Sequence, residues 1–69
     1  MDHFMISLQA ARVNAEMDQP TAAQKMGVSV QTIVNWEKGR TEPSIQQARR
    51  LSELYGIPVD YIFFPSNQI

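Results

Sequence analysis

The chain of 69 residues carries a formal net charge of −1 and no cysteine, which excludes disulfide frameworks and thiolate chemistry. Its length allows one small domain with a marginal core, for which 43% hydrophobic residues suffice. No apolar run approaches the roughly 18 residues of a membrane span and no signal-peptide pattern opens the chain, so we expect a cytoplasmic protein.

The first predicted helix covers residues 4–15 and follows a frayed N-terminus at residues 1–3. Arg12 falls near its apolar face, where a buried charge needs a carboxylate partner, and Glu37 is the candidate. The alternative is that Arg12 lays its stem over the core and keeps its guanidinium in water. The apolar face recurs at helical spacing and contains Phe4, Leu8, Ala11 and Ala15.

Two further helices are predicted at Gln19–Met26 and Val30–Lys38, joined by a tight turn. Asp18 and Ser29 are the expected N-caps, because their side-chain oxygens can accept from free amides of the first turn. Gly27 ends the first of these helices, since glycine enters the left-handed conformation without a Cβ penalty. Small residues let two helices cross closely after a short turn. The expected buried positions of the pair are Ala22, Ala23, Met26, Ile33 and Trp36.

The remaining predicted elements are two helices and a tail. Ser44 is expected to cap a helix that runs to Tyr55, and a short fifth helix starts at Pro58 and reaches Phe63 or Phe64. Residues 65–69 form the tail. No stretch shows sustained strand alternation, so we predict an all-α fold of five helices. The fourth helix is expected to turn inward Ile45, Ala48, Leu51, Leu54 and Tyr55.

The outward face of the helix at Val30–Lys38 carries side chains that can read DNA. Gln31 and Asn35 can each make paired hydrogen bonds to an adenine edge, whereas Val30 and Thr32 can pack on a thymine methyl. Many helix pairs have no nucleic-acid role. Here turn, caps, small residues and amide side chains occur together, which favours DNA binding.

The charge distribution bears on the same hypothesis. An acidic net charge argues against DNA, whose partners are usually basic. Residues 19–50, however, hold five basic and two acidic residues, a net of +3, and the rest holds one basic and five acidic residues, a net of −4. One basic face is therefore compatible with the composition, and the alternative is an ordinary scattered surface.

One sequence pattern covers nearly the whole domain, residues 4–64. It comprises Arg12, Gln19, Ala23, Gly27-Val28-Ser29, Ile33, Trp36-Glu37-Lys38-Gly39, Pro43-Ser44, Leu51, Tyr55-Gly56-Ile57 and Asp60. This pattern resembles the Cro- and lambda-repressor-like helix-turn-helix family of bacterial and phage regulators, the xre type. The spacing GVS…I..WE.G…PS is fairly specific, whereas the glutamine or the glycines alone indicate little.

The resemblance implies a compact five-helix, lambda-repressor-like domain that binds a pseudo-palindromic operator in double-stranded DNA as a homodimer. It implies a phage- or prophage-type repressor associated with the bacterial nucleoid. The third helix would lie in the major groove and the start of the second would face the DNA backbone. By position, Val30, Gln31, Thr32 and Asn35 match the base-reading residues. The backbone-contacting positions are Gln19, Lys38, Arg40 and Thr41, and the interior ion pair is Arg12 with Glu37.

Two positions depart from the family pattern. Glu16 stands where the family commonly has glycine at the end of the first helix, so we predict a positive φ there or an altered turn. Val30 stands where a polar reader is common, so base specificity would rest on fewer hydrogen bonds.

Other functions have less support in the sequence than DNA binding. His3, the one histidine, lies near the N-terminus, and no acidic pair has catalytic or metal-ligand spacing, so we expect no enzyme, metal, cofactor or small-molecule ligand. The main rival is a protein-interaction module on the same scaffold, of the antitoxin or anti-repressor type. The late aromatics Tyr61, Phe63 and Phe64 motivate it, because exposed apolar patches mark interfaces. We favour homodimerisation through the fifth helix and the tail.

Overall fold

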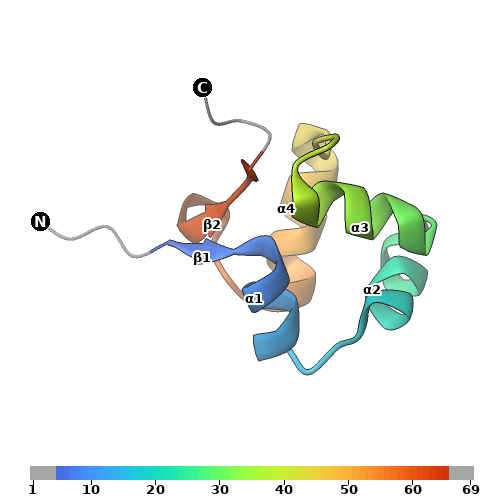
Figure 1. Ribbon diagram of the computed structural model, residues 1–69. Helices are drawn as coiled ribbons and strands as arrows, with labels where there is room; N and C mark the ends of the chain where they lie inside the picture. Colours follow the sequence, from blue (N-terminus) through green and yellow to red (C-terminus); the bar gives the residue numbers. More distant parts are fainter. Residues whose placement is uncertain (1–4, 66–69) are drawn as a thin grey trace, which may run out of the picture.

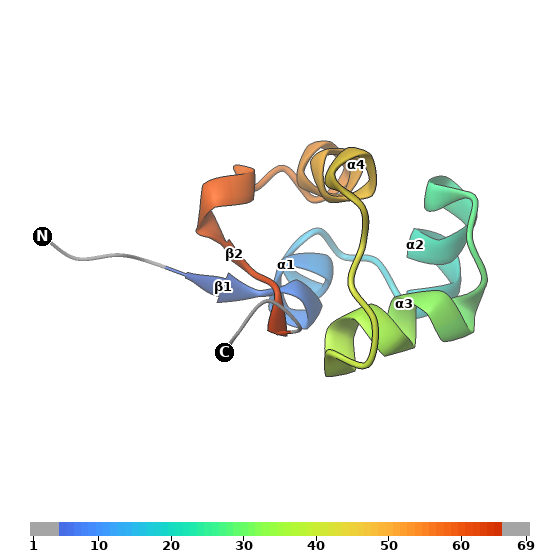
Figure 2. The same cartoon turned by 90° about the horizontal axis from the view of Figure 1, so that it is seen from above.

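The computed structural model describes residues 5–65. The strand pair lies at one end of the molecule and α2 and α3 lie at the other (Figures 1 and 2). Residues 1–3, predicted to be frayed, Phe4 and most of the predicted tail lie outside the described residues. The elements in chain order are β1 (Ile6–Ser7), α1 (Leu8–Asn14), α2 (Gln19–Met26), α3 (Val30–Lys38), α4 (Ile45–Tyr55), the 3-10 helix η1 (Val59–Tyr61) and β2 (Ile62–Phe63).

One apolar core joins these elements. The predicted burial of Ile33 and Trp36 is confirmed, with 1% and 4% of each residue exposed. The small residues Ala22 and Ala23 are also buried, which lets α2 and α3 approach closely. The core consists of Leu8, Ala11, Ala22, Ala23, Met26, Ile33, Trp36, Leu51, Tyr55 and Ile62.

Side-chain caps fix where the helices begin. The predicted caps of α2 and α3 are confirmed: an oxygen of Asp18 accepts from the Thr21 amide at 2.8 Å, and Ser29 Oγ accepts from the Thr32 amide at 3.1 Å. Hydrogen bonding from Thr21 lowers the pKa of the Asp18 carboxyl. The predicted Ser44 cap of α4 is confirmed as a reciprocal capping box with Gln47.

The turn after α1 confirms the prediction for Glu16, whose φ is 61°. The Glu16 amide donates to the Val13 carbonyl at 2.9 Å, and the Met17 amide donates to the Arg12 carbonyl at 3.2 Å. These two bonds form a Schellman motif, in which a left-handed residue reverses the chain after a helix. In the described part of the chain, the other three α-helices end on a glycine with φ between 72° and 77°.

Both ends of the domain differ from the prediction. The first helix begins at Leu8, because Ser7 Oγ caps it by accepting from the Ala10 amide at 3.0 Å. The fifth α-helix is not confirmed within residues 5–65, where the segment forms one 3-10 turn and then a strand. That strand, β2, pairs in parallel with β1, with Ile6 opposite Ile62. Strands of two residues are too short for alternation to show in the sequence.

The inward set of α4 also needs a correction. Ile45, expected inside, is 74% exposed, because it is the first residue of α4 and precedes the part of the helix that packs on the core. Leu51 and Tyr55, further along, are buried as expected. Ile62 from β2 supplies core volume instead, with 3% of the residue exposed.

Candidate nucleic-acid interface

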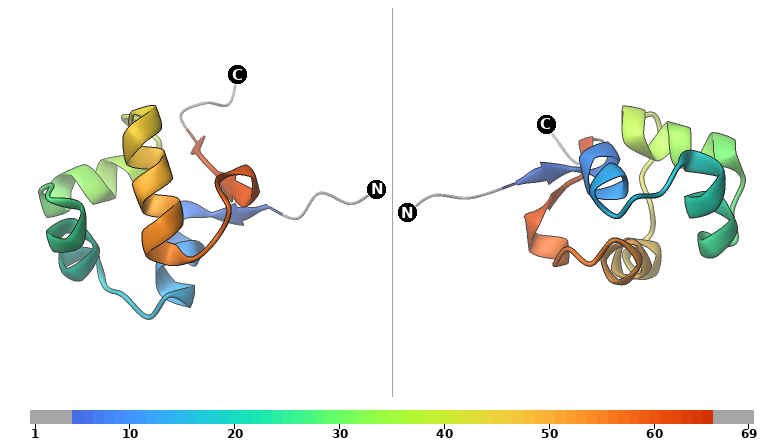
Figure 3. Two further views of the ribbon diagram at one scale, coloured as in Figure 1. Left: turned by 180° about the vertical axis from the view of Figure 1, so that it is seen from behind. Right: turned by 90° about the horizontal axis from the view of Figure 1, so that it is seen from below.

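The corner between α2 and α3 sets the orientation of α3. Gly27 adopts φ 74°, and the Val28 amide donates to the Ala23 carbonyl at 3.0 Å, so the chain reverses within one turn. Ile33 and Trp36 then hold one edge of α3 in the core. The opposite edge faces away from the core. In the right-hand view of Figure 3, α3 runs along the upper edge of the molecule.

That outer edge carries the expected base-reading amides as a connected pair. Gln31 Nε2 donates to Asn35 Oδ1 at 3.0 Å, one helical turn along. The bond leaves Gln31 its carbonyl oxygen and a second N–H proton, and it leaves Asn35 both N–H protons of its amide. Gln31 therefore retains one acceptor and one donor, the combination that an adenine edge requires. Val30, beside them, is 41% exposed.

Thr32 differs from the other predicted readers. Its hydroxyl lies 2.9 Å from Ser29 Oγ, and its amide donates to the same oxygen. The hydroxyl therefore belongs to the α3 cap, and the methyl group is the part left for an apolar contact.

The loop after α3 brings the predicted backbone-contacting residues beside the helix end. The Arg40 amide donates to the Asn35 carbonyl at 2.9 Å, which folds residues 39–41 back on the last turn of α3. Lys38, Arg40 and Thr41 are exposed there. Their roles at DNA stay predictions.

Sequence reasoning missed a contact of Arg50 that steadies this end of the molecule. Its Nη2 donates to the Lys25 carbonyl at 3.1 Å, so an α4 side chain satisfies a free carbonyl in the last turn of α2. The two residues are 25 positions apart, and no local pattern indicates the contact.

The two residues expected as an interior ion pair lie in contact. Arg12 Nε donates to Glu37 Oε2 at 2.7 Å and Nη2 donates to Oε1 at 3.3 Å, with 9% and 4% of the two side chains exposed. Arg12 Nη1 also donates to the Met17 carbonyl at 2.9 Å, which ties the α1–α2 turn to the pair. Hydrogen bonding to Glu37 raises the pKa of the Arg12 guanidinium.

Gln19, expected at the DNA backbone, is joined to the same pair. Its Nε2 donates to Glu37 Oε1 at 3.1 Å, and its side chain stays half-buried at the start of α2. Sequence reasoning missed this bond, because it links positions 18 residues apart. The structure therefore brings Gln19 to the ion pair, at the same C-terminal end of α3 that carries the other predicted backbone contacts.

The Helix-turn-helix family model matches residues 8–62. The chain belongs to the xre-type helix-turn-helix family. It is thus a DNA-binding transcriptional regulator, a class that is generally not enzymatic.

Three relatives of this helix-turn-helix chain are transcriptional regulators by name. An uncharacterized HTH-type transcriptional regulator of Methanocaldococcus jannaschii is 36% identical over 81% of this chain and 85% of its own length. The cryptic phage CTXphi transcriptional repressor RstR of Vibrio cholerae is 29% identical over 81% of this chain and 50% of its own. An uncharacterized transcriptional regulator in the ATPase CF(0) region of Rhodospirillum rubrum is 36% identical over 68% of this chain and 44% of its own length. No solved structure gives a significant match.

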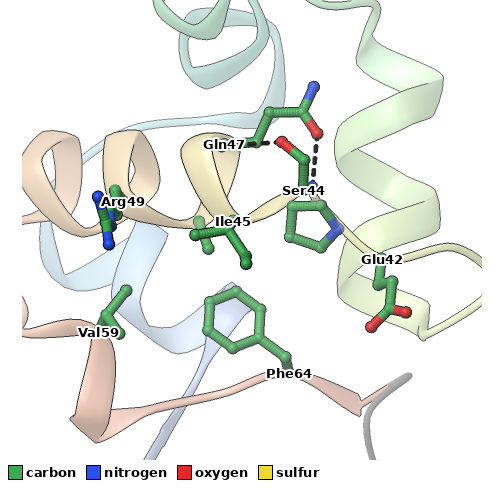
Figure 4. Close-up of a pocket in the computed structure, with 9 residues that line it drawn as sticks. Glu42, Ser44, Ile45, Gln47, Arg49, Val59 and Phe64 are labelled. Atoms are coloured by element: carbon green, nitrogen blue, oxygen red, sulfur yellow. Dashed lines mark hydrogen bonds between the residues drawn. The ribbon is translucent and has the colours of Figure 1, made fainter.

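The aromatic residues expected at a dimer interface of this helix-turn-helix domain differ in their exposure. Tyr61 is 50% exposed, whereas Phe63 and Phe64 are half-buried. Phe64 lines a groove of about 790 Å³ between α4 and the C-terminal segment, where it faces Ile45 of α4 and lies on the same side as Val59 (Figure 4). The residues of this groove come from the loop before α4, from the start of α4 and from the segment after it.

Residues 5–65 of this helix-turn-helix domain contain neither a group of metal ligands nor a membrane-spanning helix. That stretch contains no group of three or more histidine, cysteine or acidic residues placed to hold a metal. Its helices are all too short or too polar to cross a membrane.

Proposed function

We propose that the chain binds a pseudo-palindromic operator as a homodimer, with α3 of each protomer in the major groove. One observation carries this proposal: the outer edge of α3 presents the hydrogen-bonded amides of Gln31 and Asn35 away from the core. An α-helix fits the major groove, where the pattern of donors and acceptors distinguishes all four base pairs.

Base reading is assigned to the outer edge of α3. Gln31 would read adenine with its carbonyl oxygen and second N–H, and Asn35 would donate to an acceptor on a neighbouring base. Val30 and the Thr32 methyl would contact thymine methyl groups. The Thr32 hydroxyl, engaged with Ser29, supports this apolar role.

Backbone binding is assigned to residues on either side of α3. Lys38, Arg40 and Thr41 would contact phosphates at its C-terminal end, and Gln19 would contact a phosphate from the start of α2. Such contacts set the register of the protein on DNA and carry most of the salt dependence.

The regulatory outcome proposed is repression by operator occupancy. The Vibrio cholerae relative is named as a phage transcriptional repressor, which supports the phage type for this chain as well. The place of action would be the chromosome, as part of the nucleoid in the cytoplasm.

The proposal is tested by selection from a random-sequence duplex pool, with binding followed by fluorescence anisotropy at low and moderate salt. A two-fold-symmetric motif whose affinity falls steeply as salt rises is the expected result. An enriched motif without two-fold symmetry would refute the dimeric operator. No binding at low salt would refute the assignment of α3.

Two substitutions then separate base reading from backbone binding. Gln31→Ala is expected to cost about 1–3 kcal/mol on the selected operator and to relax preference at one base pair. Arg40→Ala is expected to weaken all sequences alike and to reduce the salt slope by about 1. The check is affinity for the operator and for its single-base variants. Equal weakening of every sequence by both variants would contradict the assignment of readers.

A second candidate function is protein interaction, of the antitoxin or anti-repressor type. The exposed residues Ile45 and Val59, which line the groove, and the exposed Tyr61, two positions after Val59, favour it. This function would be supported by a mutation in the groove that abolishes function in cells while the purified protein still binds the operator normally.

A further inference from the structure

Glu37 belongs to α3, but its side chain points into the protein, with 4% exposed. Its oxygens accept hydrogen bonds from two other helices: Oε2 from Arg12 Nε at 2.7 Å, and Oε1 from Gln19 Nε2 at 3.1 Å. One carboxylate therefore joins the proposed reading helix to the first residue of α2. That residue, Gln19, is the one proposed phosphate contact that does not come from the end of α3 or the loop after it.

The carboxylate determines which end of the Gln19 amide faces it. A carboxylate only accepts hydrogen bonds, so Gln19 must turn its NH₂ group, and not its carbonyl, toward Glu37. An NH₂ group has two protons, and Glu37 accepts one of them. The second proton makes no hydrogen bond within residues 5–65, and Gln19 is partly exposed. A phosphate oxygen is an acceptor that this proton can serve.

Arg12 makes the arrangement compatible with DNA. A bare carboxylate near a phosphate would repel it, but Arg12 compensates the charge of Glu37 through two hydrogen bonds. Glutamine loses much rotamer freedom when it is fixed. A side chain that is already held before DNA arrives loses less upon binding, and this strengthens the contact.

We propose that Glu37 is a positioning residue, which, neutralised by Arg12, holds the Gln19 amide with its second proton directed at a DNA phosphate. The ion pair then has a function beyond stability, because it fixes the α2 phosphate contact relative to the reading helix. This inference rests on the proposed function, since it needs Gln19 at the DNA backbone.

The test compares two backgrounds in which the pair carries no charge. Arg12→Met/Glu37→Gln keeps an amide oxygen as acceptor for Gln19, and Arg12→Met/Glu37→Leu removes it. Buried ion pairs commonly tolerate replacement by apolar residues of similar volume, and thermal melts followed by circular dichroism verify folding. The measured quantity is the loss of operator affinity caused by Gln19→Ala in the wild type and in each background.

We expect Gln19→Ala to weaken binding roughly tenfold in the wild type and in the background with glutamine at position 37. In the background with leucine, the loss should fall to about twofold or less, because Gln19 is no longer held. Equal losses in all three proteins would overturn the inference. So would an unchanged affinity for Gln19→Ala in the wild type, and in that case operator binding itself would stand.

A second measurement needs no variant. In the free wild-type protein, NMR should show the two Nε2 protons of Gln19 at separate, shifted positions with slowed exchange. Shifts and exchange equal to those of exposed glutamine side chains would overturn the inference even if the leucine background did not fold. Failure of the wild type to bind any duplex would overturn both this inference and the proposed function.

Discussion

The hydroxyl of Tyr55 is the one buried side-chain polar atom without a hydrogen-bond partner among the residues that the structure describes. The residue is 4% exposed and lies near the Arg12–Glu37 pair. Burial, followed by the charge of Glu37, raises the pKa of Tyr55 to about 12. A buried polar atom without a partner lowers stability, so the hydroxyl of this residue works against the fold.

Replacing Tyr55 by phenylalanine should therefore raise the free energy of unfolding at neutral pH, by about 1 kcal/mol, because the ring stays and the unpaired hydroxyl goes. Urea denaturation measures the change. Tyr61→Phe, at a half-exposed position, is the matched control and should have no effect. A loss of stability in Tyr55→Phe would mean that the hydroxyl has a hydrogen-bond partner.

The same residue predicts how stability depends on alkaline pH. In the unfolded chain a tyrosine ionises near pH 10, whereas folded Tyr55 stays protonated up to about 12. Between these values the unfolded state binds fewer protons, so the wild type should lose stability as pH rises, at up to about 1.4 kcal/mol per pH unit. The measurement is urea denaturation from pH 9 to 11, and Tyr55→Phe should show a shallower fall. Parallel curves for both proteins would contradict the raised pKa.

At the scale of elements, helix ends were predicted where their cause is local. Ser29 caps α3 and Ser44 caps α4 through hydrogen bonds to amides three positions further along the chain. Both partners of each bond are therefore close together in the sequence. The start of α1 is the exception, because its Ser7 cap is local but the helical spacing of Phe4 and Leu8 favoured an earlier start. The strand pair was not predicted, because β1 pairs with a segment at the other end of the chain. The bond from Gln31 to Asn35 could have been found from their four-residue spacing on one helix face.

The end of α1 supplies a prediction at this scale. Glu16 occupies a left-handed turn, which costs a residue with a Cβ roughly 1–2 kcal/mol. Glycine would avoid this cost, but it would increase the conformational entropy of the unfolded chain, which offsets part of the gain. Glu16→Gly should therefore raise the free energy of unfolding by about 0.5–1 kcal/mol. Chemical denaturation checks it, with Glu16→Ala as the control that keeps the strained turn. Equal stability of the glycine and alanine variants would show that the turn is not strained.

At the scale of the whole molecule, the sequence indicated the family and the positions of α2 and α3 but not the surface beside α4. Ile45 was expected inside because it fits the helical period of α4. Its exposure depends on where the core ends, which is set by the packing of α1 and β2 and not by the period. The groove beside it brings together the start of α4 and Phe64, which lie too far apart along the chain for a local pattern to indicate.

Homodimerisation is predicted to use this groove. Ile45→Asp should weaken self-association about tenfold or more, because it places a charge among the apolar residues of the proposed interface. The fold should persist, since aspartate is favourable at the first position of a helix. Sedimentation velocity at micromolar concentrations measures the effect. Val13→Asp is the control, because Val13 is 58% exposed on α1 and does not line the groove. Equal effects of both variants would exclude the groove as the interface.

The pairing of Ile6 with Ile62 has a consequence for the order of assembly. It closes a loop that spans most of the described chain, and long loops are slow to close. The α2–α3 corner needs only contacts between near neighbours, so it can form early and the strand pair can close last. By the same reasoning the strand pair is the first part to open. The α2–α3 corner, which we propose meets DNA, would then outlast transient opening of the strand pair.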